Sequence, residues 1–160
     1  ILKKSKADSF FLFISPSDPN FIMNLALKKG IDKGDIYIKF APRKELPVLI
    51  SVSSVSIFFI KNSFSKKASS PTKHAELMGL GIPVIANSGV GDVDNVILGT
   101  ESGKVVNLSD PNPYQEICIN IDKLLEIKKE TIRKNGMKIF ALEIGVNDYR
   151  KIYSRLELLN

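Results

Sequence analysis

Apolar positions along the chain fall into short continuous runs, which alternate with stretches where an apolar residue recurs every three or four positions. A continuous run of strand length is typical of a strand covered on both faces, and the second pattern is typical of a helix. The runs predict strands at residues 10–14, 35–41, 55–60, 83–87 and 104–108. The other stretches predict helices at residues 20–29, 45–51, 71–80, 93–98, 114–128, 129–142 and 146–159.

This alternation predicts an α/β fold with a doubly wound parallel sheet, followed by C-terminal helices. We expect the apolar face of the last helix to pack on the domain, at least in part. That face holds Tyr149, Ile152, Tyr153 and Leu156. Ligands of such a sheet bind beyond the carboxyl ends of its strands. The loops that leave the strands are therefore the candidate site, and they cover residues 15–19, 42–44, 61–70 and 88–92.

Composition and charge limit the class of protein and its possible partners. The 160 residues are 44% hydrophobic and 25% charged, which fits one soluble domain. The net charge of +6 fits nucleic acid, an anionic membrane surface or phosphate-bearing small molecules as partners. Because aromatic residues are not interleaved with basic ones, we expect no nucleic-acid partner. No apolar run could cross a bilayer and no signal-peptide pattern is present, so we expect a cytoplasmic protein, with peripheral contact at the inner membrane face left open.

The chain has one cysteine, Cys118, and one histidine, His74. One cysteine cannot form an internal disulfide, and single residues of these types cannot form a Cys or His metal cluster. We therefore expect no bound metal and no cofactor. Cys118 lies on the apolar face of a predicted helix and is expected to be a buried, inert thiol. His74 is expected at the surface.

One segment has an unusual charge pattern. No acid occurs over residues 46–75, although the chain has 17 acids. The same segment holds the lysines Lys61, Lys66, Lys67 and Lys73. Ser70 is expected to cap the next helix and Pro71 to open it, which puts Lys73 at the third helical position. Positive charge at this end of a helix costs about 0.3–1 kcal/mol unless an anion binds there. The segment therefore predicts a phosphate site, with a solvated basic loop as the alternative.

Two further features lie beside this segment. Glu76 is the first acid after it, one helical turn beyond Thr72, and it is placed to accept hydrogen bonds from ribose or sugar hydroxyls. An ordinary surface glutamate would have the same pattern. The Gly-Val-Gly turn at residues 89–91 follows the fourth predicted strand. A tight turn closed by Asp92 or Asp94 explains it as well as contact with a ligand does.

The residues from Ser69 to Asn87, SSPTKHAELMGLGIPVIAN, are similar to the signature helix and strand of retaining glycosyltransferases of the group 1 (family 4) type. That family has a GT-B fold. In it, a small or Pro-containing turn precedes a helix that carries a glutamate, and a small residue, a glycine and the pattern x-Pro-Val-Ile follow. The similarity is strong over residues 68–94 and looser over residues 10–60, where it depends on the order of the elements.

The resemblance implies a retaining, metal-independent glycosyltransferase that uses a nucleotide-diphosphate sugar. This chain would be its donor-nucleotide-binding C-terminal half, and the acceptor would bind mainly in an N-terminal domain outside this sequence. Glu76 would hold the ribose hydroxyls, the groups around Ser70 to Thr72 would contact the diphosphate, and the Pro42-Arg43 turn would border the nucleobase. The expected substrate-binding residues are Ser69, Ser70, Pro71, Thr72, Lys73, Glu76 and Arg43. No residue is assigned a catalytic role.

The sequence departs from the family pattern at two places. Ala68 stands where the family has a second glutamate that contacts the donor sugar, so the sugar would be held differently or by the neighbouring serine and lysines. The Arg and Lys that the family carries near its first strand also have no counterpart. We therefore expect a single, N-terminally truncated domain over residues 1–160 that lacks the first strand. Residues 1–6 would be the tail of the first helix, and the isolated chain would be inactive.

Two other functions stay open. A GT-B nucleotide-sugar 2-epimerase would have the same fold, although such enzymes supply more acidic residues and histidines on this half than the single His74. A non-enzymatic, nucleotide-sensing or receiver-like α/β module is the other alternative. A receiver needs paired acids after its first strand, where this chain has Ser17 and Asp18.

Overall fold

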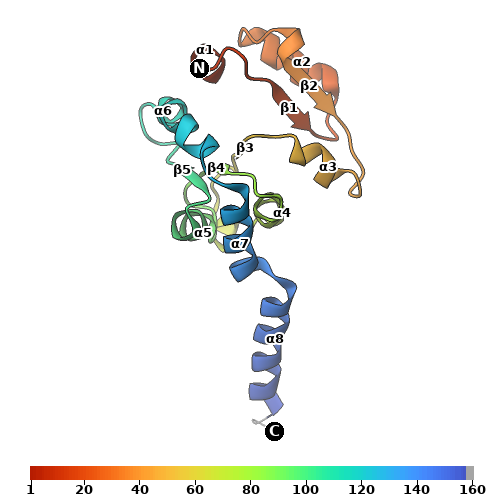
Figure 1. Ribbon diagram of the computed structural model, residues 1–160, viewed down its shortest axis with the longest axis vertical. Helices are drawn as coiled ribbons and strands as arrows, with labels where there is room; N and C mark the ends of the chain where they lie inside the picture. The colour runs from red at the N-terminus through yellow and green to blue at the C-terminus, as the bar shows by residue number, and fades with distance from the viewer. Residues whose placement is uncertain (158–160) are drawn as a thin grey trace.

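The computed structural model describes residues 1–157 as an alternation of strands and helices (Figure 1). Its strands are β1 (Phe11–Ile14), β2 (Ile36–Lys39), β3 (Ser56–Phe58), β4 (Val84–Asn87) and β5 (Gly103–Val106). Its α-helices are α1 (Leu2–Ser5), α2 (Pro19–Lys28), α3 (Leu46–Ser51), α4 (Thr72–Leu80), α5 (Val93–Thr100), α6 (Pro113–Leu125), α7 (Lys129–Phe140) and α8 (Leu142–Glu157). Its 3-10 helices are η1 (Lys33–Asp35) and η2 (Phe64–Ala68). Every predicted strand is present, and the α/β fold class is confirmed.

All the strand pairs are parallel, as predicted, but the strands form two sheets. In the first sheet β1 pairs with β2, and Phe11 lies opposite Ile36. In the second sheet β4 lies between β3 and β5. Within the described residues, one edge of β1 and one edge of β3 therefore have no strand partner.

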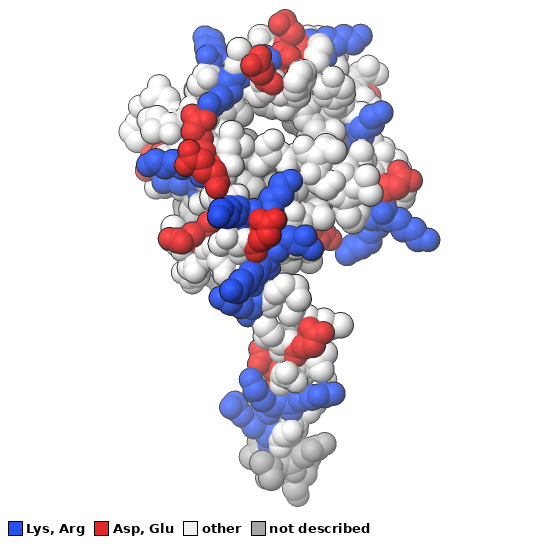
Figure 2. Space-filling model, in the orientation of Figure 1, with Lys and Arg blue, Asp and Glu red and all other residues white. Residues whose placement is uncertain are grey.

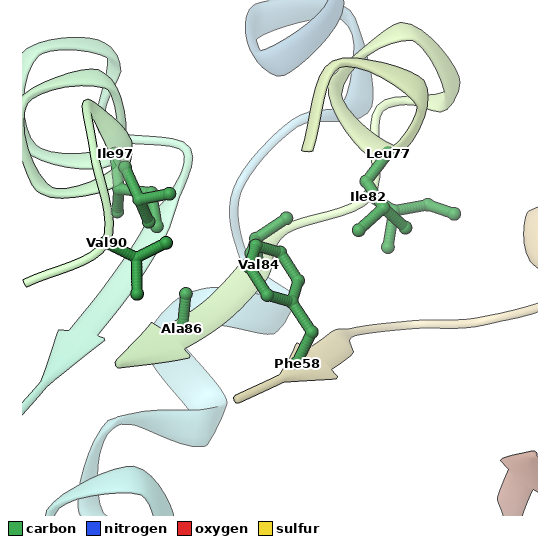
Figure 3. Close-up of a cluster of buried hydrophobic side chains, with 8 residues drawn as sticks. Phe58, Leu77, Ile82, Val84, Ala86, Val90 and Ile97 are labelled. Carbon is green, nitrogen blue, oxygen red and sulfur yellow. The ribbon is translucent and has the colours of Figure 1, made fainter. Parts of the chain in front are cut away.

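Strand β4 is the centre of the core. All four of its residues are buried, because both of its edges are paired and both of its faces are covered. On one face Val84 and Ala86 pack with side chains from β3, α4, α5 and the adjoining loops (Figure 3), which are Phe58, Leu77, Ile82, Val90, Val93 and Ile97. Ile85 packs on the other face with side chains of β5 and α6, which are Val106, Ile117, Ile121 and Leu124. Helices on both faces make the fold doubly wound.

The two last helices differ in their contacts. α7 packs on α4, where Ile132 and Met78 are fully buried, and a β-carbon at Gly136 would lie 2.9 Å from the Cβ of Met78. α8 instead projects from the body (Figure 1). Its exposed apolar side chains are Leu142, Val146, Tyr149, Ile152, Tyr153 and Leu156. The expectation that the face of Tyr149, Ile152, Tyr153 and Leu156 packs on the domain is therefore wrong, because each of these side chains is more than half exposed. Figure 2 shows Lys and Arg side chains gathered where α7 meets α8.

The structure also describes the single cysteine, the possible metal ligands and the helices that could span a membrane. Cys118 is a free, half-buried thiol and not a buried one as predicted, because its side of α6 is only partly covered. Over residues 1–157, no group of three or more His, Cys, Asp and Glu side chains is arranged to hold a metal ion. No helix in the same range has both the length and the hydropathy of a membrane-spanning segment.

Candidate functional site

The buried side chain of Asn87 is hydrogen-bonded to both loops that follow β3 and β4. Its Oδ1 accepts a hydrogen bond from the backbone N–H of Ile60 at 2.7 Å, and its Nδ2 donates to the carbonyl oxygen of Ile60 at 3.0 Å. The same Nδ2 lies 3.0 Å from Oδ1 of Asn62 and 3.1 Å from the carbonyl oxygen of Ser88. Asn87 is 1% exposed, so water does not compete for these bonds. They hold the loop after β3 against the loop after β4.

Two glycines of the loop after β4 allow close approach to the segment before α4. Gly91 has a φ of +48°, and a β-carbon at this position would lie 1.7 Å from the carbonyl oxygen of Ser69. Gly89 has a φ of +80°, and a β-carbon at this position would lie 3.3 Å from Nδ2 of Asn62. Its N–H donates to Oδ2 of Asp94 at 3.4 Å, so Asp94 closes the turn. Only glycine adopts both conformations without strain, and the turn therefore packs directly on the predicted phosphate segment.

Helix α4 begins one residue later than predicted, which changes its cap. Pro71 occupies the N-cap in an extended conformation and has no side-chain acceptor, so Ser70 does not cap the helix as expected. Lys73 is consequently at the second helical position and not at the third. No acid lies in the first turn, and no side chain caps it. The N–H of His74 donates to the carbonyl oxygen of Pro71 at 2.9 Å, so the N–H groups of Thr72 and Lys73 are the free ones, with positive charge beside them.

The side chains of the predicted phosphate segment differ in their contacts. The hydroxyl of Ser69 already donates to the carbonyl oxygen of Lys66 at 3.1 Å. The Nζ of Lys73 lies 5.5 Å from the ring centroid of Phe58, at the end of β3. Ser70 and Thr72 are exposed, as are Lys66, Lys67 and Ala68 on η2. The groups that remain accessible to a ligand are thus the hydroxyls of Ser70 and Thr72, the lysines and the N–H groups of α4.

His74 is buried, and the expectation of a surface histidine is wrong. It is 1% exposed, and its ring centroid lies 6.2 Å from that of Phe58 and 5.8 Å from that of Phe140. Burial lowers the pKa of His74 below its usual value, and the nearby Asp92 carboxylate partly opposes this shift. Within the described residues, its Nε2 has no hydrogen-bond partner. A neutral imidazole in the core is the consequence.

Arg43 and Glu76 lie together at the mouth of a cleft between α3 and α4. The Nη2 of Arg43 is 3.3 Å from Oε1 of Glu76. The cleft has a volume of about 300 Å³, and its other lining residues are Leu46, Pro47, Ile50, Gly79 and Leu80. Because the Arg43 side chain is 89% exposed, the ion pair contributes only about 0–1 kcal/mol and opens at little cost. An apolar wall with a few polar groups at its rim is typical of a small-molecule site.

Comparisons with known proteins bear on the fold. No protein-family model and no curated protein matches the sequence. The structure is similar to the solved structure of sucrose-phosphate synthase from Thermosynechococcus elongatus, with a TM-score of 0.64 and 18% sequence identity. The match covers 93% of this chain and 39% of that one. The fold is that of a Rossmann-like GT-B half. At this identity the likeness concerns the fold alone.

The predicted site residues form two neighbouring groups at helix α4. The first is the start of α4 with the segment before it, residues 69–73. The second is the cleft of Arg43 and Glu76, one helical turn farther along α4. Sequence reasoning missed Asn87. The sequence did contain a signal for it, because Asn87 is a polar residue at the end of an otherwise apolar strand. A buried amide in such a position requires hydrogen-bond partners.

Proposed function

We propose that this chain is the donor-binding, C-terminal half of a glycosyltransferase, and that it holds the nucleotide part of a nucleotide-diphosphate sugar. One observation carries the proposal. The uncapped start of α4 and Glu76, which lines the cleft beside Arg43, lie on the same helix, one turn apart. With a rise of about 1.5 Å per residue, Thr72 and Glu76 are about 6 Å apart along the axis, which is on the scale of a nucleoside diphosphate.

The diphosphate binds at the start of α4. The free N–H groups of the first turn and the Thr72 hydroxyl donate hydrogen bonds to its oxygens, and Lys73 adds charge. The hydroxyl of Ser70 is accessible from the same side. Ser69 acts differently, because its hydroxyl is already bonded and its backbone packs on Gly91. It supports the shape of the segment more than it contacts the ligand.

The nucleoside occupies the cleft between α3 and α4. The Glu76 carboxylate accepts hydrogen bonds from the ribose hydroxyls, and it can do so once its exposed ion pair with Arg43 opens. Arg43 and the apolar wall formed by Leu46 and Pro47 then border the base. This arrangement accounts for a glutamate that lines a cleft of about 300 Å³ while its side chain stays 41% exposed to an incoming ligand.

The transfer itself is proposed to be retaining and metal-independent. Lys66, Lys67 and Lys73 balance the charge that develops on the leaving diphosphate, as fixed cations do in group transfer. The side chain of Ala68 has no polar atom to offer the donor sugar, so other groups hold the sugar. The acceptor binds mainly in a second, N-terminal domain.

Calorimetric titration with UDP, GDP, ADP and CMP tests the proposal. The matched variant is Glu76→Gln, with Glu130→Gln on α7 as the control. Loss of charged hydrogen bonds of about 1.5–3 kcal/mol predicts at least tenfold weaker binding of the preferred nucleoside diphosphate to Glu76→Gln. Binding of inorganic diphosphate should not change. Equal losses for both ligands would refute the ribose role, and a folded chain that binds none of the four nucleotides at millimolar concentration would refute the proposal.

A further inference from the structure

A second cavity of this fold lies beneath helix α2, apart from the candidate site. It has a volume of about 400 Å³ and lies between α2 and the sheet of β1 and β2, in the part of the chain that Figure 1 shows next to the N-terminus. Its lining residues belong neither to the start of α4 nor to the Arg43–Glu76 cleft. A ligand in this cavity therefore binds independently of the proposed nucleotide.

The local patterns of β1 and α2 give this cavity apolar walls. Alternate residues of a strand share a face, so Phe11 and Phe13 of β1 form one wall. Residues three and four positions apart share a face of a helix, so α2 forms the opposite wall with Ile22, Leu25 and Ala26. We call these three residues the α2 stripe.

The α2 stripe leaves the space between the walls unfilled and open. Ala26 lies one helical turn beyond Ile22, where a larger apolar side chain would project into the cavity. Protein interiors normally leave few voids larger than a water molecule. Here Phe13 is 39% exposed and Leu25 is 49% exposed, so the cavity opens to the surface and a ligand can enter it.

Lys29 is the one charged side chain in the lining. It lies at the C-cap of α2, where lysines often bond the last carbonyl oxygens of a helix. The carbonyl oxygens of Ala26 and Leu27 already accept hydrogen bonds from the N–H groups of residues 29–31. Lys29 also forms no ion pair with an acid of residues 1–157. Its ammonium group is therefore available to a ligand.

The surroundings of this ammonium group are positive. Residues 28–33 contain three lysines and one acid, Asp32, and all four side chains are exposed. The next acid, Asp35, is paired with Lys3 at 2.8 Å, so it does not offset these lysines. The mouth of the cavity therefore attracts an anion.

The size and the polarity of the cavity limit the class of ligand. An apolar cavity of about 150 Å³ is large enough to bind benzene, so this one can hold a longer hydrocarbon group. Apart from Lys29, no lining side chain can form a hydrogen bond, so a sugar or a nucleotide would leave its polar groups unpaired there. The ligand that fits is apolar along most of its length and anionic at one end.

We propose that this cavity binds a single-chain anionic amphiphile. The hydrocarbon tail lies between the α2 stripe and β1, and the anionic group lies at Lys29. Fatty carboxylates and alkyl phosphates share this chemistry.

Titration with soluble amphiphiles, below the concentrations at which they form micelles, tests the proposal. Octanoate, decanoate, octyl phosphate and octylammonium are added to the chain, and the methyl NMR signals of Ile22, Ile31 and Ile36 report binding, because these residues line the cavity. Decanoate should bind about 15-fold more tightly than octanoate, since each buried CH₂ group contributes about 0.8 kcal/mol. Octylammonium, with the opposite charge on the same tail, should bind about fivefold more weakly than octanoate.

Two substitutions test the tail and the head group separately. Ala26→Phe puts a ring into the cavity and should abolish binding of octanoate and decanoate. Lys29→Gln should weaken octanoate binding about fivefold and leave binding of 1-octanol unchanged. Lys28→Gln is the matched control, because Lys28 does not line the cavity, and it should change neither affinity. Unchanged methyl signals of Ile85 in β4 show that each variant is folded.

Tighter binding of either octanoate or octyl phosphate supports the proposal and identifies the head group. Equal affinity for octanoate and octylammonium would overturn the anionic head group, and affinity that does not depend on tail length would overturn the cavity as the site. A folded Ala26→Phe that binds as the parent chain does would have the same consequence. If vesicles of an anionic phospholipid bind but no soluble amphiphile does, the chain contacts a membrane surface and the proposal is wrong.

Discussion

The side-chain amide of Asn87 pairs with Ile60 as a neighbouring strand would, accepting from its N–H and donating to its carbonyl oxygen. The backbone ladder between β3 and β4 ends at the pair of Phe58 and Ala86. The amide therefore extends the connection beyond the end of β3. It determines where the lysine-containing loop at residues 61–70 leaves the sheet.

Replacing this amide should destabilise the protein. In Asn87→Ala, the N–H and the carbonyl oxygen of Ile60 lose their partners in a part-buried position, and each unsatisfied group costs about 1–3 kcal/mol. We expect urea denaturation to show a loss of about 2–6 kcal/mol in the free energy of unfolding. Asn95→Ala, on the exposed side of α5, is the matched control and should change stability by less than about 0.5 kcal/mol. Similar losses in the two variants would contradict the role of the Asn87 amide.

The strands and the end of α4 were predictable because their signals are local. Continuous apolar runs reported the strands, and Gly81 ends α4 with a φ of +72° as a helix-terminating glycine does. The division into two sheets was not predictable, because pairing depends on strands far apart in the sequence. The start of α4 was misplaced by one residue, since Ser70 and Pro71 compete for the same cap position and only the backbone conformation separates them.

Gly91 is predicted to tolerate no side chain. The β-carbon of Gly91→Ala would lie 1.7 Å from the carbonyl oxygen of Ser69, and the φ of +48° adds strain. The segment before α4 must therefore move, so we expect a lower melting temperature and weaker binding of nucleoside diphosphate. The control is Gly99→Ala on α5, where a β-carbon has open space. Because alanine favours a helix over glycine by about 1 kcal/mol, the control should be neutral or stabilising. Two variants of equal stability would refute the close contact.

His74 should make stability depend on pH. Burial lowers its pKa in the folded state below the ordinary value of 6.5, so the unfolded chain binds the proton more readily. The contribution of neutral His74 to the free energy of unfolding is fully present above pH 6.5. It is lost as the pH falls from 6.5 through the lower pKa of the folded state. Urea denaturation between pH 8 and pH 5 should show this loss, and it should be smaller in His74→Phe. An identical pH dependence in the variant would mean that other groups cause it.

The candidate site was predictable only in part, because some of its contacts depend on packing between elements that are far apart in the sequence. Glu76 could be singled out because a helical period places it one turn from Thr72. The burial of His74 could not be predicted, because its ring packs on Phe140 at the end of α7, which is far away in the sequence. The contact between Arg43 and Glu76 depends on how α3 packs beside α4, and no local pattern specifies this packing.

Thr72→Glu should stabilise the ligand-free protein and weaken its binding of nucleoside diphosphate. A carboxylate in the first turn of α4 meets the positive end of the helix dipole, where no acid is present, and should stabilise the ligand-free protein by about 0.3–1 kcal/mol. The same charge repels a diphosphate at that end and should weaken binding of nucleoside diphosphate at least tenfold. Denaturation and calorimetry should therefore change in opposite directions. Asn95→Glu on α5 controls for added charge and should leave binding unchanged. If Thr72→Glu binds as tightly as the parent chain, the ligand does not use the start of α4.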